Sequence, residues 1–313
     1  MIVGLLAAVL FSLTPLAIMV VAVVGWKNSK RMLMPVATMN KTVQNITINA
    51  LDTRLDVSGS HDELKDLAET FNSMLDRIQG AYDQQNQFVS DASHELRTPI
   101  AVIQGYANLL ARWGKDDPAV LAESIESIKT EADNMKDLVE KLLFLARGDK
   151  KSQPVEKEKF PLHQLVEEIV KETKLIDADH HIILQHCQSL TIYADRKLLK
   201  EALRVFVDNS IKYTPPQGQI TIGCYTQKSR AVVTVADTGR GIPAADLPHI
   251  FNRFYRADKS RTKETGGTGL GLAIAQWIIH QHGGTIEVES QLNQGTKVTV
   301  LLPLLSTGGN NLG

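Results

Sequence analysis

Apolar positions follow three patterns along the chain, and the first is a continuous run at the N-terminus. No residue between Ile2 and Val24 is charged, and about 23 residues of helix span roughly 35 Å, enough to cross a bilayer core. Trp26 follows at an interfacial position, with a group of basic residues directly after it. Because basic residues mark the cytoplasmic side of a span, residues 1–26 predict one transmembrane helix in the cell (inner or cytoplasmic) membrane, with the later domains in the cytoplasm. A cleaved signal peptide is the alternative, but its apolar core is about 7–15 residues long and is normally preceded by a basic residue.

The second pattern, over residues 27–80, is a pair of short amphipathic segments. The first is compatible with a helix from Pro35 to about Ala50, and Gly59 then breaks the chain. The second segment begins at Asp62, which can cap a helix. After it, apolar residues recur at three-four spacing: Leu64, Leu67, Ala68, Phe71, Leu75 and Ile78. Neither segment can bury its apolar stripe alone, so we expect a partner chain; a plain coiled-coil linker is the alternative.

The third pattern, over residues 81–150, predicts two longer helices joined by a turn. The first helix carries one apolar stripe: Phe88, Ala92, Leu96, Ile103 and Leu110. A turn is predicted from Trp113 to Pro118, and the second helix has a nearly heptad rhythm: Leu121, Ile125, Ile128, Ala132, Met135, Leu138, Leu142 and Leu145. One stripe per helix predicts that two copies of the chain pair their hairpins into a four-helix bundle, which makes a homodimer.

His94 lies on the first of these helices, inside the stretch SHELRTPI. It is two residues, or about 200°, from its apolar neighbours, so its ring is predicted to face solvent. Glu95 is adjacent and Thr98 lies one turn on, on the same side. Pro99 has no N–H and is predicted to bend the helix. An exposed helical histidine is usually a plain surface residue, but an imidazole is nucleophilic near neutral pH and a neighbouring carboxylate can take its proton.

Helical and strand-like patterns mix over residues 151–305, which predicts an α/β domain. Residues 161–176 fit a helix, and Asp195 can cap a second one. Strand-like stretches are HIILQH, LTIY, QITIGCYT and AVVTVAD. The tail, residues 306–313, is expected to be disordered.

Composition narrows the possible partners. Charged residues make up 22% of the chain and the formal net charge is -1, which gives no case for direct nucleic-acid binding. Cys187 and Cys224 form no CxxC pair, so we expect two buried, reduced thiols in place of a disulfide or a zinc site.

Three stretches of the α/β region suggest a nucleotide site: DNSIKYTP, DTGRGI and GGTGLGLAIA. Glycine-rich turns and helix N-termini favour phosphate groups, a carboxamide oxygen suits Mg²⁺, and a lysine offers a point charge to a phosphate. A buried carboxylate can accept a hydrogen bond from the amino group of adenine. The sequence contains no P-loop, because no GK[ST] follows the glycines.

Taken in order, SHELRTP, DNSIKYTP, DTGRGI, FNRFYR and GGTGLGL closely resemble a membrane-bound sensor histidine kinase of two-component signalling. The resemblance runs from about Lys27 to Pro303. Residues 27–80 resemble a HAMP relay, with Pro35 and the Asp62-Glu63-Leu64 step at the positions that family marks. The resemblance implies a multidomain fold: an N-terminal transmembrane helix, an all-α HAMP module and dimeric four-helix-bundle hairpin, then an α/β-sandwich ATPase domain of the Bergerat (GHKL) type.

The resemblance also implies a function: autophosphorylation by ATP and Mg²⁺, phosphotransfer to an aspartate of a response-regulator receiver domain, and phosphatase activity toward that regulator. It makes His94 the phospho-acceptor, Glu95 its general base and Thr98 the phosphatase residue. The implied nucleotide-binding residues are Asn209 (also the Mg²⁺ ligand), Lys212, Tyr213, Asp237, Gly239, Gly241, Phe254, Gly267, Thr268, Gly269, Leu270 and Gly271. Phe251 joins Phe254 in an aromatic box, and the glycines from Gly266 to Gly271 end a lid over the phosphates.

Two departures from the family pattern affect these expectations. Many relatives have a second asparagine four residues before Asn209, where this chain has Val205, so the magnesium site needs water or another side chain. Only one span and no outer sensor domain are predicted, which indicates a missing start, or sensing in the membrane, in the cytosol or through a partner. The alternative functions are a GHKL-type ATPase and a non-catalytic membrane signalling adaptor.

Overall fold

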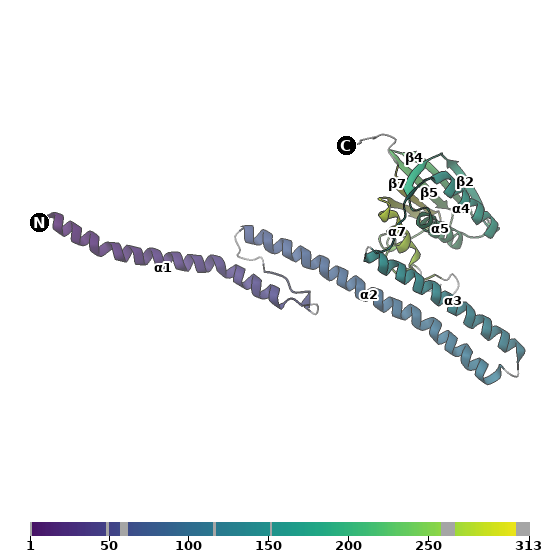
Figure 1. Cartoon of the computed structure of the whole chain (residues 1–313), viewed down its shortest axis with the longest axis horizontal. Helices are drawn as coiled ribbons and strands as arrows, with labels where there is room; N and C mark the ends of the chain where they lie inside the picture. Colours follow the sequence, from purple (N-terminus) through teal and green to yellow (C-terminus); the bar gives the residue numbers. More distant parts are fainter. Residues whose placement is uncertain are drawn as a thin grey trace. The chain divides into compact units, whose positions relative to one another are not determined.

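A computed structural model describes residues 2–47, 50–56, 62–114, 117–150, 152–257 and 267–304. The chain divides into two compact units, Met1–Val89 and Ser90–Gly313 (Figure 1). Predictions that concern Gly59, Gly266 and the tail 306–313 lie outside the described residues.

The first unit begins with one long helix, α1 (Ile2–Asn45). It joins the predicted span to the first amphipathic segment, because no residue between Trp26 and Pro35 ends a helix. The amphipathic segment that was expected to continue to about Ala50 ends earlier, at Asn45. Among the residues that the structure describes, no helix combines the length and the apolar character that a membrane span needs. The transmembrane helix over residues 1–26 stays a prediction.

The connector of the first unit packs against the start of α2 (Asp62–Trp113). The side-chain amide of Asn72 bonds both backbone groups of Leu55, at 2.8 and 3.0 Å, and Arg54 donates to Asp76 at 2.6 and 2.9 Å. Leu55 and Leu75 are buried in the single chain, whereas Leu67, Met74 and Ile78 are exposed. Part of the apolar stripe thus lacks cover within one chain, as the amphipathic pattern predicts.

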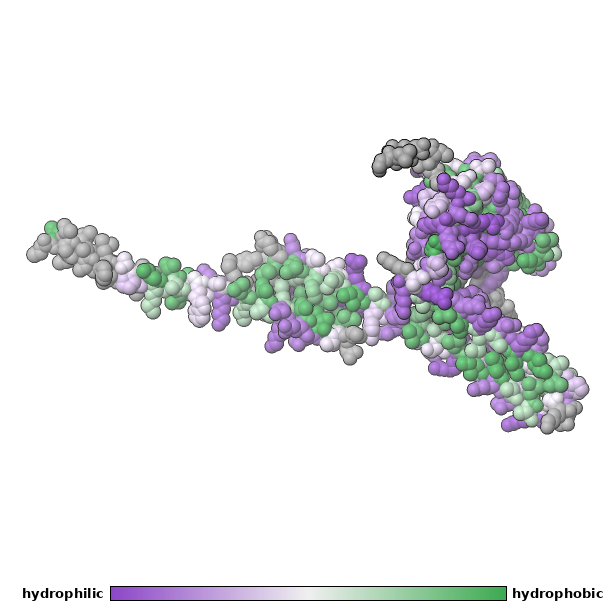
Figure 2. Space-filling model, viewed as in Figure 1, coloured by the Kyte–Doolittle hydropathy of each residue, from purple (hydrophilic) through white to green (hydrophobic). Residues whose placement is uncertain are grey.

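The second unit opens with the predicted hairpin, formed by the end of α2 and by α3 (Pro118–Asp149). Asp117 caps α3 by accepting the N–H groups of Ala119 and Val120, at 2.8 and 3.3 Å. Apolar residues run along this hairpin (Figure 2), and large ones remain exposed in the single chain: Ile100, Val102, Leu109, Leu121, Ile125, Val139 and Leu143.

The remainder of the second unit is an α/β domain, in chain order β1 (Glu158–Pro161), α4 (Leu162–Ile176), β2 (His181–Cys187), β3 (Thr191–Ala194), α5 (Arg196–Tyr213), β4 (Gln219–Gln227), β5 (Arg230–Asp237), the short 3₁₀ helix η2 (Leu247–His249), α7 (Gly271–Gln281), β6 (Thr285–Gln291) and β7 (Gly295–Pro303). The sheet has the order β2-β4-β5-β7-β6, in which only β2 and β4 pair in parallel. A second, antiparallel pair joins β1 and β3. Helices α4, α5 and α7 pack against the main sheet (Figure 1). An all-helical region followed by an α/β domain is confirmed.

The cysteine prediction is wrong, because a disulfide joins Cys187 on β2 to Cys224 on β4. The parallel register makes these two residues direct neighbours, with their Cα atoms 4.5 Å apart. Sequence spacing gave no hint of this, since the residues are 37 positions apart and their contact arises only when β4 pairs with β2.

Candidate nucleotide site and exposed histidine

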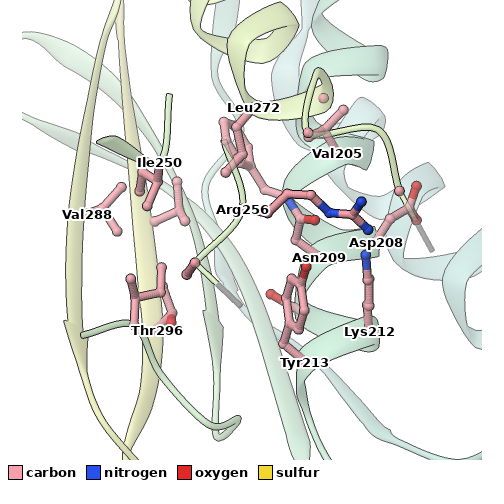
Figure 3. A pocket seen from close by; sticks show the side chains of 18 of the residues that line it. Val205, Asp208, Asn209, Lys212, Tyr213, Ile250, Arg256, Leu272, Val288 and Thr296 are labelled. Carbon is pink, nitrogen blue, oxygen red and sulfur yellow. The ribbon is translucent and has the colours of Figure 1, made fainter. Parts of the chain in front are cut away.

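A cavity of about 490 Å³ lies beside α5 and the sheet of the α/β domain. Residues from all three glycine- or asparagine-containing stretches line it: Asn209, Lys212, Tyr213, Asp237, Gly241, Gly267, Thr268, Gly269 and Gly271. Figure 3 shows Asn209, Lys212 and Tyr213 projecting from α5 on one side, with Ile250, Val288 and Thr296 on the other. The fold therefore gathers motifs that lie some 60 residues apart along the chain.

Asp237 ends β5 and is held by three donors. Its carboxylate accepts from the Ser210 hydroxyl at 3.0 Å, from the Gly239 N–H at 2.9 Å and from the Thr296 N–H at 3.1 Å. These bonds fix the orientation of an ionisable group that faces the cavity. An ionised carboxylate has about four acceptor positions, so Asp237 retains capacity for one more donor from a ligand.

Gly239 and Gly241 shape the turn after Asp237. A Cβ on Gly239 would lie 2.6 Å from the Tyr213 carbonyl oxygen. Gly241 has φ +70°, and a Cβ there would lie 2.0 Å from the carbonyl oxygen of Gln291. Any side chain at either position would displace backbone. Gly241 lines the cavity, whereas Gly239 does not and acts only on the turn.

Cations surround the ring of Tyr213 at the end of α5. The Lys212 ammonium lies 5.0 Å and the Arg240 guanidinium 4.5 Å from the ring centroid, both within cation–π range. Lys212 also reaches the backbone of Gly267, because a Cβ there would meet its Nζ at 2.9 Å. The sequence pattern did not single out Arg240, although it lies inside DTGRGI.

The glycines before α7 make close backbone contacts. Gly269 has φ +70°, and a Cβ on it would lie 2.7 Å from the backbone of Phe254. The Phe254 N–H in turn donates to the Gly269 carbonyl at 3.0 Å. Phe251 lines the cavity, but Phe254 does not, and Leu270 is fully buried. The role of Phe254 and Leu270 in nucleotide binding stays a prediction.

Two further polar residues line the cavity and were not predicted. Asp208 precedes Asn209, and Arg256 belongs to FNRFYR. In the view of Figure 3, the Arg256 side chain extends toward the α5 side of the cavity, where Asp208, Asn209 and Lys212 lie. Burial raises the pKa of Asp208, against the opposing effects of Arg204 and Lys141. Both residues could have been proposed from the sequence, because Asp208 lies in DNSIKYTP and Arg256 in FNRFYR.

Val205 lines the cavity where many relatives have an asparagine. Its Cγ1 would lie 3.2 Å from a Cβ on Gly271, so the side chain packs under the start of α7. Within the described part of the chain, no group of three or more His, Cys, Asp or Glu residues could hold a metal ion. The Asp208 carboxylate and the Asn209 amide line the cavity within about one helical turn of Val205.

His94 is exposed on α2, as predicted, with Thr98 exposed and Glu95 half-buried. Pro99 is buried, and α2 continues through it as one helix; the bend at this residue stays a prediction. None of these residues lines the cavity. The acceptor candidate and the nucleotide site are therefore separate parts of the second unit in this structure.

The hairpin nevertheless contacts the α/β domain through the end of α3. The rings of Phe144 and Trp277 meet edge to face with centroids 5.1 Å apart. Arg253 donates to both carboxylate oxygens of Asp149, at 2.6 and 3.0 Å. Lys141, about one turn before Phe144 on α3, lines the nucleotide cavity.

Comparisons with known proteins match three families along the chain. The HAMP domain matches residues 28–80, the His Kinase A (phospho-acceptor) domain matches residues 84–151, and the histidine kinase-, DNA gyrase B- and HSP90-like ATPase family matches residues 194–306.

Curated relatives include the signal transduction histidine-protein kinase ArlS of Staphylococcus haemolyticus, 37% identical over 287 residues, and ArlS of Staphylococcus aureus, 34% identical over 287 residues. Each match covers 91% of this chain and 63% or 64% of the relative. The chain thus spans a little under two thirds of the length of these proteins.

Two solved structures share the fold. The Acinetobacter baumannii histidine kinase AdeS is 26% identical with a TM-score of 0.53, over 70% of this chain and 98% of that one. The histidine kinase ThkA, solved in complex with the response regulator protein TrrA, is 26% identical with a TM-score of 0.57, over 70% of this chain and 61% of that one.

Proposed function

The chain belongs to the sensor histidine kinases of two-component systems, and we propose that it phosphorylates itself on His94 with ATP and passes the phosphoryl group to an aspartate of a response regulator. The observation that carries this proposal is the cavity that gathers Asn209, Lys212, Asp237 and the glycines before α7, in the same unit as an exposed histidine followed by an acid. Dephosphorylation of the regulator is the accompanying activity.

Nucleotide binding follows from the two ends of the cavity. At the apolar end, Ile250 and Val288 offer a surface for the adenine ring, and the oriented carboxylate of Asp237 accepts its amino group. At the other end, Lys212 and Arg256 supply positive charge for the phosphates (Figure 3). Backbone N–H groups at the start of α7, with the positive end of its dipole, favour the same anion.

Magnesium fits the oxygen donors at the phosphate end. Asn209 and Asp208 would hold it, with water in the positions that a second asparagine would otherwise fill. When bound, the ion neutralises charge on the phosphate oxygens. Because Val205 cannot act as a ligand, we expect weaker magnesium binding than a site with two asparagines provides.

Phosphoryl transfer to His94 requires a nucleophilic ring and a place for its proton. A ring nitrogen of His94 attacks the γ-phosphorus, the bond from that phosphorus to the ADP oxygen breaks, and ADP leaves. Glu95 takes the proton of the imidazole ring. Thr98, exposed one turn further along α2, orients the water that later hydrolyses the aspartyl phosphate of the regulator.

Dimerisation and membrane attachment belong to the same proposal. The exposed apolar residues along the hairpin, such as Ile100 and Leu121, require a second copy of the chain to form a four-helix bundle. The HAMP match and the ArlS relatives support membrane anchoring, with the later domains on the cytoplasmic side. ThkA, which was solved with a response regulator protein, supports a receiver domain as the partner.

The test is a labelling experiment on the full chain with γ-labelled ATP and Mg²⁺. Wild type is compared with His94→Gln and with a control, His186→Gln, which changes an exposed histidine on β2. We expect acid-labile, base-stable label in wild type and control, and none in His94→Gln, which still binds ATP. ATP hydrolysis without label would favour a GHKL-type ATPase, and ATP binding with neither would favour a signalling adaptor.

A further inference from the structure

The nucleotide cavity has one wall that the nucleotide-binding motifs do not supply. Of the described residues that line it, Lys141 alone comes from the hairpin; the others belong to the α/β domain. No motif predicted this residue, because its distance in sequence from Asn209 hides their proximity.

Lys141 lies at the charged end of the cavity. Burial raises the pKa of Asp208 and of Glu201, two acids of α5, and the charge of the Lys141 ammonium opposes that rise in both. Asp208 lines the cavity together with Lys212 and Arg256. Lys141 therefore adds its charge to that of the other cations that line the cavity, Lys212, Arg240 and Arg256.

The ammonium of Lys141 can change partners at little cost. It is paired with Asp137 on its own helix at 2.5 Å, and the two side chains are 35% and 59% exposed. An exposed pair at this spacing contributes only about 0.3–0.5 kcal/mol. A polyphosphate, with its higher charge, competes well for such a lysine.

Packing holds the helix that carries Lys141 against the α/β domain. Phe144, three residues later and hence on the same side of α3, meets Trp277 of α7. Asp149 binds Arg253 through both carboxylate oxygens. These contacts hold Lys141 beside the cavity.

We propose that Lys141 contacts the phosphates of bound ATP, so that the nucleotide site is complete only when the α/β domain packs on α3. This inference rests on the proposed function, because it concerns the same site. Its consequence is reciprocal: ATP strengthens the packing on α3, and the packing strengthens ATP binding by the same factor.

The test compares the affinity of the full chain for ATP with its affinity for adenosine, which lacks phosphates. Lys141→Met removes the charge, Lys141→Arg keeps it, and Lys129→Met is the control on an exposed part of α3. We expect Lys141→Met to weaken ATP binding about tenfold, as for one charge-assisted contact, with adenosine binding unchanged. Lys141→Arg should retain most of the affinity.

A second variant makes a prediction of opposite sign. Asp137→Asn removes the competing partner of Lys141, so ATP should bind about twofold more tightly, and Lys141→Met combined with it should lose that gain.

Equal ATP affinities of wild type and Lys141→Met would overturn this inference alone, since the proposed function needs only that wild type binds ATP. Parallel losses for ATP and adenosine would also overturn it, because they indicate a packing role. A wild-type chain that binds no ATP would overturn the proposed function together with the inference.

Discussion

The indole of Trp277 lies directly over the backbone of Gly148, and a Cβ on Gly148 would come within 2.7 Å of its Nε1 atom. This contact connects the last turn of α3 to the middle of α7, whose first residue, Gly271, lines the nucleotide cavity. The absence of a side chain at residue 148 thus allows the hairpin and the nucleotide-binding domain to meet.

We expect Gly148→Ala to weaken the packing of α3 on α7. The added methyl group forces the indole away, at a cost of about 1–3 kcal/mol for overpacking. Hydrogen exchange of residues 144–149 and 271–281 should become faster. The control is Gly105→Ala, because a Cβ there meets nothing within 4 Å. Equal exchange in both variants would show that Trp277 adapts without loss of the contact.

Replacement of Asp237 by asparagine should weaken nucleotide binding with little change in stability. The asparagine oxygen can keep the Gly239 and Thr296 N–H groups, and its NH2 group can donate to the Ser210 hydroxyl, which also accepts hydrogen bonds. ATP binding should weaken at least about tenfold. Ser210→Ala, which removes only one of the three donors, is the comparison, and urea unfolding with an ATP titration measures both effects. Unchanged ATP affinity in Asp237→Asn would separate this carboxylate from adenine recognition.

Thr98→Ala should separate the two directions of phosphoryl chemistry. Autophosphorylation of His94 should persist, because Thr98 takes no part in proton removal. Dephosphorylation of a receiver domain that the wild type phosphorylates should slow by about tenfold to a hundredfold, the range expected when a reacting water loses its position. Thr130→Ala, on an exposed part of α3, should change neither rate. An unaltered dephosphorylation rate in Thr98→Ala would rule out this role.

The pair His180–Asp177 predicts a pH-dependent contribution to stability. Their side chains are largely buried, with Nδ1 2.6 Å from the Asp177 carboxylate and Nε2 3.0 Å from the Thr214 carbonyl oxygen. Burial alone would lower the pKa of His180, but these bonds and the nearby charges of Asp177 and Asp179 raise it above its ordinary value. The stabilisation is therefore fully present below about pH 6.5, the unfolded value, and is lost as pH rises through the raised folded pKa.

Urea midpoints of wild type and His180→Gln, compared from about pH 6 to about pH 9 around that value, measure this contribution. The advantage of wild type should shrink as the pH rises. His186→Gln, in which an exposed histidine changes, is the control. A difference that is constant with pH would mean that folding leaves the pKa of His180 unchanged.

Removal of the Cys187–Cys224 disulfide should lower the stability of the α/β domain. The bond closes a loop over 37 positions, and the chain-entropy estimate for that length is about 4 kcal/mol. In urea unfolding, wild type with reductant and the double variant Cys187→Ser/Cys224→Ser should have the same stability. Both should be less stable than wild type without reductant. Two thiols that react with an alkylating reagent without reductant would contradict the bond.

Local rules were sufficient for elements whose residues are close in sequence. The cap Asp195, the strands β2 to β5 and the exposed face of His94 all depend on spacing within one or two turns or one strand. The strands β6 and β7 were not predicted, although their alternation, in TIEVES and TKVTVLL, was a usable signal. The motif residues were recognisable because glycine, asparagine and lysine have specific uses at a phosphate site.

Tertiary structure alone decided which distant residues meet. The register of β2 and β4 brings Cys224 beside Cys187. The turn after β5 brings Arg240 to the ring of Tyr213, which Lys212 also contacts. Lys141 lines the cavity because α3 packs on α7. These contacts depend on how helices and strands dock, and no short-range preference of the backbone encodes that. The sequence by itself determined the order of domains and the chemistry available to them, whereas docking decided which groups share one site.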